Sequence, residues 1–138
     1  MNTIEVSTDP ARLDLALIHR WLSESSYWAR GRSMEMVVRA IENSLPFGAY
    51  LDGQQVGFAR VVTDRATFAW LADVFILDEY RGRGYGKALV AAVLAHPELQ
   101  GLRRWLLATR DAHGLYAQSG FVPVPPERFM ELLDITAR

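Results

Sequence analysis

The sequence contains no cysteine. Disulfide bonds, thiolate metal ligands and cysteine nucleophiles are therefore all excluded. Histidine is scarce as well, and the three that are present form neither an HxH nor an HxxxH pair: His19, His96 and His113. A metal site would have to combine one of them with carboxylates far away along the chain. We therefore predict no metal site.

Long apolar runs and an excess of positive charge are also missing. No run approaches the roughly 20 residues that a helix needs to cross a bilayer, and the N-terminal segment lacks the basic start and apolar centre of a signal peptide. The formal net charge is −1, whereas proteins that bind nucleic acid non-specifically usually carry a clear basic excess. We expect a cytoplasmic protein whose partners include neither a membrane nor a nucleic acid.

What the sequence does contain is typical of one globular domain. Its 138 residues are 50% hydrophobic and 22% charged, which supplies material for one core and leaves little room for a second. No repeat, low-complexity tract or Gly/Ser-rich linker divides the chain. We therefore predict a single domain over residues 1–138.

The N-terminal part predicts a short strand followed by two helices. Residues 3–7 are strand-like, and apolar side chains at helical spacing predict a helix from about Pro10 to Leu22. The polar stretch 23–33 predicts a loop. Ser33 then begins a second helix, which ends near Asn43.

Three strand-like runs come next. Residues 47–51 and 55–62 are separated by Asp52-Gly53, a dipeptide that favours a two-residue hairpin turn. The longer run 67–77 is rich in aromatic and branched residues, which indicates a central strand covered on both faces. The three runs predict an antiparallel meander.

The C-terminal part alternates between helices and strands. The glycine-rich segment 81–86 leads into a helix that is broken at Pro97, and residues 104–109 predict another buried strand. Asp111 can cap a short helix through Gln118, and residues 129–135 suit an edge strand better than a short helix. Together these elements predict an α/β (α+β) fold, in which helices cover both faces of a mixed, mainly antiparallel sheet.

The segment RGRGYGK at residues 81–87 carries the chemistry. The first turn of a helix leaves N–H groups without partners, and the helix dipole makes that end attract an anion. Glycine at three alternate positions lets a phosphate approach those groups, while Arg81, Arg83 and Lys87 add positive charge. The segment predicts a pyrophosphate site.

A glycine-rich turn does not always bind a phosphate, and those that do follow several patterns. A G-x-G sequence can be a tight connection and nothing more. The dinucleotide fingerprint requires G-x-G-x-x-G, whereas this chain has G-x-G-x-G. The P-loop requires Ser or Thr after its lysine, but Ala88 follows Lys87. Neither nucleotide motif fits.

The segment resembles the acetyl-coenzyme A signature of the GCN5-related N-acetyltransferase (GNAT) family. That signature is Arg or Gln, two residues, Gly, one residue, then Gly or Ala, and it is matched by Arg81, Gly84 and Gly86. The Leu-Tyr pair and Gly-Phe within residues 115–121 resemble a second family motif. The resemblance spans about residues 71–121. It implies an acyl-coenzyme A acyltransferase fold and an enzyme that moves an acetyl group from acetyl-coenzyme A, by direct attack, to a primary amine of a small molecule or a protein.

The resemblance also implies roles for particular residues. The main chain of Phe75 and Ile76 would pair with the pantetheine arm, and an N–H there would polarise the thioester carbonyl. The expected coenzyme-binding residues are Phe75, Ile76, Arg81, Gly82, Arg83, Gly84, Tyr85, Gly86 and Lys87. Tyr116 would be the general acid toward the leaving thiolate, although it could also be a structural aromatic residue of the short helix.

The proton acceptor and the amine site each have several candidates. Asp73 is a candidate base whose pKa burial could raise, or else a structural residue that bonds to the main chain. Asp111 and His113 are further candidates for proton transfer. The family often has Asn seven residues before the tyrosine, where this chain has Thr109. In the loop, the candidates for amine binding are Tyr27, Trp28, Arg30 and Arg32, which could also be ordinary solvated loop residues.

Two other functions remain open. The same segment could bind an acyl-coenzyme A in a sensor that transfers nothing, or the chain could be a structural domain without such a ligand. Tyr116 favours the enzyme. A homodimer is also compatible with the sequence.

Overall fold

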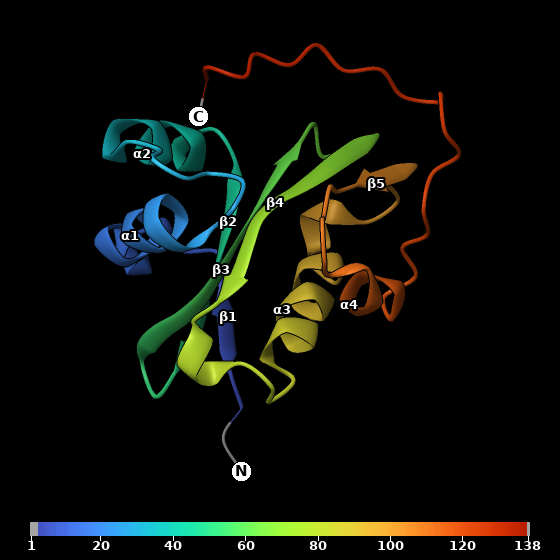
Figure 1. Cartoon of the computed structure of the whole chain (residues 1–138). Coiled ribbons are helices and arrows are strands. Elements are labelled where there is room, and N and C mark those ends of the chain that lie inside the picture. Colours follow the sequence, from blue (N-terminus) through green and yellow to red (C-terminus); the bar gives the residue numbers. More distant parts are fainter. Residues whose placement is uncertain (1–2, 138) are drawn as a thin grey trace.

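The computed structural model of the chain describes residues 3–137 and has a five-stranded sheet at its centre (Figure 1). The strands follow one another in chain order across the sheet. They are β1 (Glu5–Ser7), β2 (Leu45–Leu51), β3 (Gln54–Thr63), β4 (Phe68–Ile76) and β5 (Arg104–Leu106). The first four are antiparallel, and only β5 runs parallel to its neighbour β4. The predicted mixed, mainly antiparallel sheet is confirmed.

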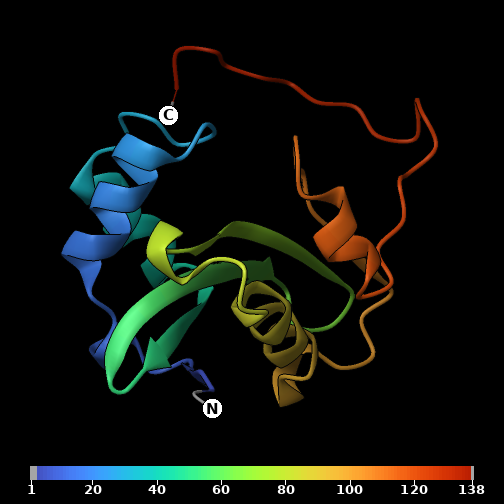
Figure 2. The same cartoon turned by 60° about the horizontal axis from the view of Figure 1, so that its bottom comes forward.

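Helices cover both faces of this sheet, as Figure 2 shows. On one face lie α1 (Leu15–Ser25) and α2 (Met34–Glu42), and on the other lie α3 (Tyr85–Leu94) and α4 (His113–Ala117). Each pair of helices closes its own hydrophobic cluster. Phe58 and Phe75 point from the sheet to α1 and α2, whereas Leu71 and Ile76 point to the other side.

The hairpin between β2 and β3 forms as predicted. Asp52 and Gly53 have φ angles of 51° and 82°, and positive φ at both central positions is what a type I′ turn requires. β2, the first strand of this hairpin, begins at Leu45, earlier than predicted, and so includes Pro46. That proline is tolerated because β1 pairs with β2 only from Gly48 onward.

The first helix begins later and ends later than predicted. Residues 10–12 form a separate 3-10 turn, and Asp14 caps α1 through a bond from Leu17 N–H to Oδ1. The Asp14 N–H donates to Gln55 Oε1 at 2.7 Å, which fixes the start of the helix against the sheet. The second helix lies as predicted, with Ser33 as its N-cap and Asn43 as its C-cap.

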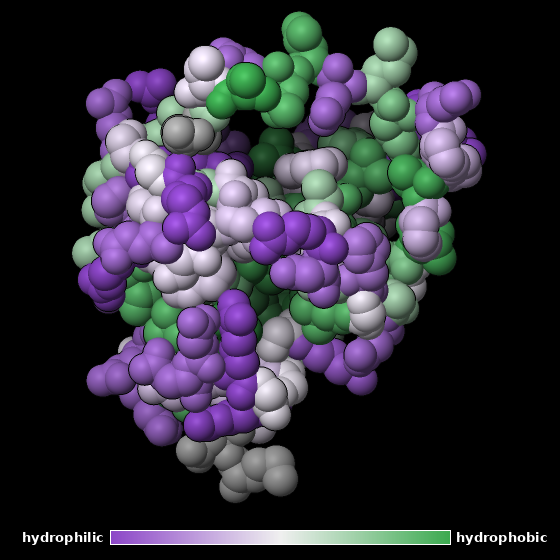
Figure 3. Space-filling view, viewed as in Figure 1, coloured by the Kyte–Doolittle hydropathy of each residue, from purple (hydrophilic) through white to green (hydrophobic). Residues whose placement is uncertain are grey.

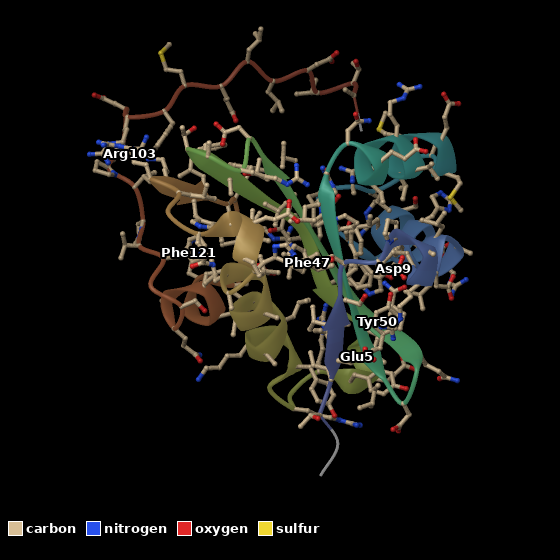
Figure 4. The ribbon with its side chains drawn as sticks, turned by 180° about the vertical axis from the view of Figure 1, so that it is seen from behind. Glu5, Asp9, Phe47, Tyr50, Arg103 and Phe121 are labelled. Atoms are coloured by element: carbon tan, nitrogen blue, oxygen red, sulfur yellow. The ribbon has the colours of Figure 1, made fainter. Side chains whose placement is uncertain are left out.

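Three predictions for the C-terminal part are wrong. β5 ends at Leu106 and not at residue 109, and its residues are exposed or half-buried where a buried strand was predicted. Asp111 does not cap α4, since the N-cap is Ala112, whose N–H bonds to Thr109 Oγ1 at 3.0 Å. Residues 129–135 form neither a strand nor a helix. The tail leaves beside Phe121 and α4 (Figure 4) and arcs over the end of the sheet toward the side of α2 (Figure 1). Several of its large apolar side chains are exposed: Val122, Val124, Phe129, Met130, Leu132, Leu133 and Ile135.

Candidate active site

A cleft of about 1070 Å³ opens where β4 and β5 separate. The two strands pair only through residues 68–70 and 104–106. Beyond that point the remaining residues of β4 form one wall and the 108–112 loop forms the opposite wall. The space-filling view in Figure 3 shows a hollow below the C-terminal tail, with hydrophobic atoms at its floor. The site residues predicted from the sequence line this cleft, with the exceptions of Arg83 and His113.

The glycine-rich segment forms one end of the cleft. Gly82 and Gly84 have φ angles of 78° and 82°, and a Cβ built on either would meet no heavy atom within 4 Å beyond the adjacent residues of the chain. Gly84 is the N-cap of α3, whose first intrahelical bond runs from Ala88 N–H to the Gly84 carbonyl. The N–H groups of Gly86 and Lys87 precede that bond and have no acceptor within the helix. The positive end of the α3 helix dipole therefore faces open space in the cleft.

The three cationic side chains of this segment lie differently. Lys87 lines the cleft. Arg81 also lines it, but its Nε donates to the Ile76 carbonyl at 3.3 Å and its Nη2 lies 3.5 Å from Asp78 Oδ1. Arg83 lies outside the cleft walls, where it bonds to the Glu79 carbonyl at 3.3 Å.

The end of β4 presents its main chain to the cleft at alternate residues. Leu77 N–H donates to the Val56 carbonyl of β3 at 2.8 Å, so by alternation the main chain of Phe75 also faces β3. The main chain of Ile76 faces the opposite way, as its bond with Arg81 shows. Phe75 contributes its ring, which stacks on Trp21 with centroids 4.3 Å apart.

A β-bulge in β4 directs Asp73 into the cleft wall. Arg60 pairs with Ala72, and Phe58 pairs with Phe75, so two residues of β4 oppose one of β3. Asp73, with φ of 54°, occupies the bulge. A single extra residue reverses which face every later side chain points to. The bulge therefore turns Phe75 toward α1 and leaves Asp73 facing the loop before α2.

Asp73 is buried in a cluster of donors. Its Oδ1 accepts from Trp28 Nε1 at 2.7 Å, and its Oδ2 accepts from Arg32 Nη1 at 2.9 Å and Arg60 Nε at 2.8 Å. Burial alone would raise the pKa of Asp73, but the two guanidinium groups and their hydrogen bonds together hold it below its usual value. The expectation of a raised pKa is thus wrong, because two positive charges outweigh desolvation. The partners are side chains and not the main chain.

Tyr116 lies in α4 across the cleft from β4. Its side chain is buried in the same hydrophobic cluster as Leu71, and its ring contacts Phe121 at 6.0 Å between centroids. Burial, together with Tyr27 and Asp111 nearby, raises its pKa to about 12. The phenol is therefore protonated at neutral pH and can donate a hydrogen bond into the cleft.

A contact across the cleft joins the α1–α2 loop to the β5–α4 loop. The Arg110 N–H donates to the Tyr27 hydroxyl at 2.7 Å, and the Arg110 guanidinium lies over the Tyr27 ring, 3.9 Å from its centroid. The Tyr27 ring in turn contacts Trp28 edge to face at 5.0 Å. Two loops whose contacting residues are 83 positions apart in the sequence are thus bridged at this end of the cleft.

The cleft also contains large or charged residues that the sequence did not single out, among them Trp21, Arg60, Trp70 and Arg110. Arg60 had a signal, since a charged residue within an apolar strand needs a buried partner. Asp111 and Thr109 line the cleft as well.

Across residues 3–137, no three His, Cys, Asp or Glu side chains are grouped so as to hold a metal ion. None of the helices in that range is long and apolar enough to cross a membrane.

Comparison with known proteins identifies the family. The model of the acetyltransferase (GNAT) family matches residues 15–121. FG08082 of Gibberella zeae, a candidate acetyltransferase, is 33% identical to this chain over 136 residues. The match covers 83% of this chain and 76% of FG08082. The chain belongs to the GNAT acetyltransferase family, as the motifs at residues 81–86 and 115–121 indicated.

Solved structures agree with this assignment. A candidate GNAT acetyltransferase from Xanthomonas campestris pv. campestris is 57% identical and superposes with a TM-score of 0.93 over 97% of this chain and 95% of that one. The SA2161 protein of meticillin-resistant Staphylococcus aureus superposes with a TM-score of 0.73 over 96% of this chain and 99% of that one. At 21% identity it shows the shared fold alone.

Proposed function

We propose that this protein transfers an acetyl group from acetyl-coenzyme A to a primary amine in the cleft between β4 and α4. The observation that carries the proposal is that one cleft joins an anion-attracting helix end, an unpaired strand edge and a protonated phenol. Family membership implies the use of acetyl-coenzyme A. The arrangement supports that use.

The residues at the start of α3 fit a diphosphate. Open space beside Gly82 and Gly84 leaves room for phosphate oxygens, and the N–H groups of Gly86 and Lys87 would donate to them. The Lys87 side chain would add charge from the cleft wall. Arg83 points elsewhere, so its contribution would be limited to a weaker long-range attraction.

The edge of β4 would hold the pantetheine arm. The main chain of Ile76 faces the cleft. The main chain of Val74, two residues earlier, faces the same way by alternation. An extended arm could pair with these groups as an added strand would. An N–H at this edge would also stabilise negative charge on the thioester oxygen during attack. Phe75 would support the site through its ring on Trp21.

The chemical step would be direct attack by the neutral amine. Its nitrogen forms a bond to the carbonyl carbon while the carbon–sulfur bond breaks, the amine releases its extra proton to solvent, and the sulfur leaves as a thiolate. The Tyr116 phenol would donate a hydrogen bond to that sulfur. A typical thiol has a pKa of about 8.5, far below about 12 for Tyr116. The phenol would therefore act chiefly as a donor, with the final proton coming from solvent.

Asp73 would have a positioning role in this scheme. An ionised carboxylate that already accepts three hydrogen bonds is a weak base, and those bonds fix Trp28 and Arg32 in the wall of the amine site. Tyr27, Trp28 and Arg32 would contact the amine. The proton of the incoming ammonium would then leave through water in the cleft.

A thiol-release assay with acetyl-coenzyme A and a panel of amines tests the proposal. Release that depends on an amine, with the acetylated amine found by mass spectrometry, is the expected result. Acetyl-coenzyme A at about 100 times its dissociation constant should also stabilise the fold by roughly 2.7 kcal/mol. Stabilisation without release for any amine would favour the sensor, and no stabilisation would contradict both.

We also propose a homodimer and a cytoplasmic location. The apolar side chains exposed along the tail favour pairing with a second copy of the chain. The cytoplasmic location expected from the sequence stays a prediction, which cell fractionation would test.

A further inference from the structure

The end of the cleft that is lined by the loop between α1 and α2, which we call the amine end, has a strong excess of positive charge. Its walls carry four arginines against two aspartates, Asp73 and Asp111, and the arginines come from three separate segments: Arg30, Arg32, Arg60 and Arg110. The chain as a whole has a net charge of −1. The excess is therefore local to this site and is not a general property of the surface.

Asp73 cannot cancel this charge. Arg32 and Arg60 share its single carboxylate, and their side chains are only 12% and 15% exposed. One net positive charge thus remains in a largely buried position. Charge of this kind is costly unless an anion or oriented dipoles compensate it.

Arg32 also retains an unused donor. Its Nε is buried and has no hydrogen-bond partner among residues 3–137. A buried N–H without an acceptor costs free energy, and a ligand or water that accepts from it would remove that cost. The planar guanidinium offers further donors beside Nε, in the geometry that suits a carboxylate or a phosphate.

The remaining arginines of this end are accessible to a ligand. Arg30 is exposed in the same loop as Arg32. Arg110 lies across the cleft, and its nearest carboxylate oxygen, on Asp111, is 3.9 Å away, at the limit of an ion pair. The half-exposed rings of Trp28 and Trp70 form apolar surfaces between these charges.

These charges discriminate between classes of amine. A polyamine or a lysine-rich peptide would bring additional positive charge to a positive wall and would be repelled. An amine that also bears an anionic group would be oriented by it, because the anion is drawn to the guanidinium groups while the amine is directed away from them. The reacting nitrogen could then point toward the edge of β4.

We infer that the acceptor is a small amine carrying a carboxylate or phosphate, which is bound by Arg32 with Arg30 beside it. The inference depends on the proposed acetyl transfer and names its acceptor class. The reaction consumes one amine and one thioester, and the anionic group remains unchanged on the acetylated product.

Matched pairs of amines test this class. Each pair shares its amine and differs in the anion: phenylalanine against phenylalaninamide, and 2-aminoethyl phosphate against ethanolamine, with spermidine as the polycation. We expect kcat/KM to be at least tenfold higher for the anionic member of one pair, and this preference to shrink as salt is added. The pair that shows the preference separates carboxylate from phosphate. Equal or reversed preference in both pairs would overturn the inference while leaving acetyl transfer intact.

Charge-reversal variants locate the preference. Arg30→Glu should lower kcat/KM for the anionic amine at least tenfold, mainly through KM, and should lower kcat/KM for the neutral amine by a clearly smaller factor. The control is Arg20→Glu, an exposed arginine of α1 outside the cleft that changes the net charge equally. An equal effect of both variants would contradict a local anion site. Arg32→Lys, which keeps the charge facing Asp73 but loses the planar fork, should weaken the preference with the fold retained.

A binding experiment covers the case in which no amine releases thiol. Calorimetry with N-acetylphenylalanine and N-acetylphenylalaninamide, and with inorganic phosphate, measures the anion site without turnover. Tighter binding of an anionic probe that is lost in Arg30→Glu would support the site even though the proposed transfer had failed. Absence of anion binding would overturn it.

Discussion

The indole Nε1 of Trp28 donates a hydrogen bond of 2.7 Å to Oδ1 of Asp73, and so ties the loop after α1 to the bulge in β4. The two residues are 45 positions apart in the sequence. Because the same carboxylate also holds Arg32 and Arg60, one buried side chain sets the shape and the charge of the amine end of the cleft.

Replacing Asp73 with Asn should destabilise the fold by about 3–5 kcal/mol, since it leaves two guanidinium groups buried without a counter-charge. Urea denaturation measures this. The folded pKa of Asp73 lies below its ordinary value of 3.8, so its stabilisation is present above about pH 4 and is lost as the pH falls through the folded value. The difference between wild type and variant should therefore shrink in acid. Glu98→Gln, which breaks an exposed pair with Arg65, should cost less than about 1 kcal/mol.

Gly84→Glu should abolish acetyl-coenzyme A binding, because a carboxylate would enter the phosphate site. Gly101→Glu is the matched control: Gly101 also has a positive φ, of 76°, and open space around its Cβ position, but it lies outside the cleft. Both variants carry a similar backbone strain. Calorimetry should show loss of binding only for Gly84→Glu, and equal affinity in both folded variants would refute the placement of the diphosphate.

Tyr116→Phe should lower kcat at least tenfold and change acetyl-coenzyme A affinity little, since only the hydrogen bond to the leaving sulfur is removed. Tyr50→Phe removes a buried hydroxyl near Glu5 and Asp9, at the back of the molecule (Figure 4), and should leave kcat unchanged. The phenol pKa of about 12 also predicts that Tyr116 causes no loss of kcat between pH 7 and 10. Unaltered turnover in Tyr116→Phe would rule out the donor role.

Lys87→Ala should weaken acetyl-coenzyme A binding about fivefold, which corresponds to about 1 kcal/mol for an exposed charge. Arg83→Ala should have a smaller effect because Arg83 points toward Tyr80, with its guanidinium 5.5 Å from that ring. Titration calorimetry at low salt compares the two. A larger loss for Arg83→Ala would mean that its side chain turns into the cleft when the coenzyme binds.

The double substitution Leu132→Ser and Leu133→Ser should convert a dimer to a monomer if the exposed tail forms the interface. Light scattering after gel filtration gives the mass of each form. The paired change Val62→Ser and Leu15→Ser, at exposed apolar residues elsewhere, serves as the control. A monomeric wild type, or a variant that stays dimeric, would contradict pairing through the tail.

Much of the fold could be predicted because its signals are local. The Asp52-Gly53 turn and the Ser33 cap each depend on the conformational preferences of a few adjacent residues. The predicted start of α1 was wrong because Asp9 caps only the short 3-10 turn, whereas Asp14 caps the helix itself. The Asp14 N–H also bonds to Gln55 on β3, a contact between distant segments of the chain. The tail failed because its apolar residues resemble a strand, although no partner strand forms within residues 3–137.

The sequence by itself determined the family and the glycine-rich end of the cleft, since glycines at fixed spacing and the helix that follows them are contiguous. Only the tertiary structure decided the state of Asp73, the direction of Arg83 and the charge of the amine end. Each of these depends on side chains that meet from distant segments, and the bulge that turns Asp73 toward Arg32 leaves no mark in a single sequence. The ionisation of a buried carboxyl depends on the partners that the fold brings beside it, and the pKa of Asp73 is low because Arg32 and Arg60 lie next to it.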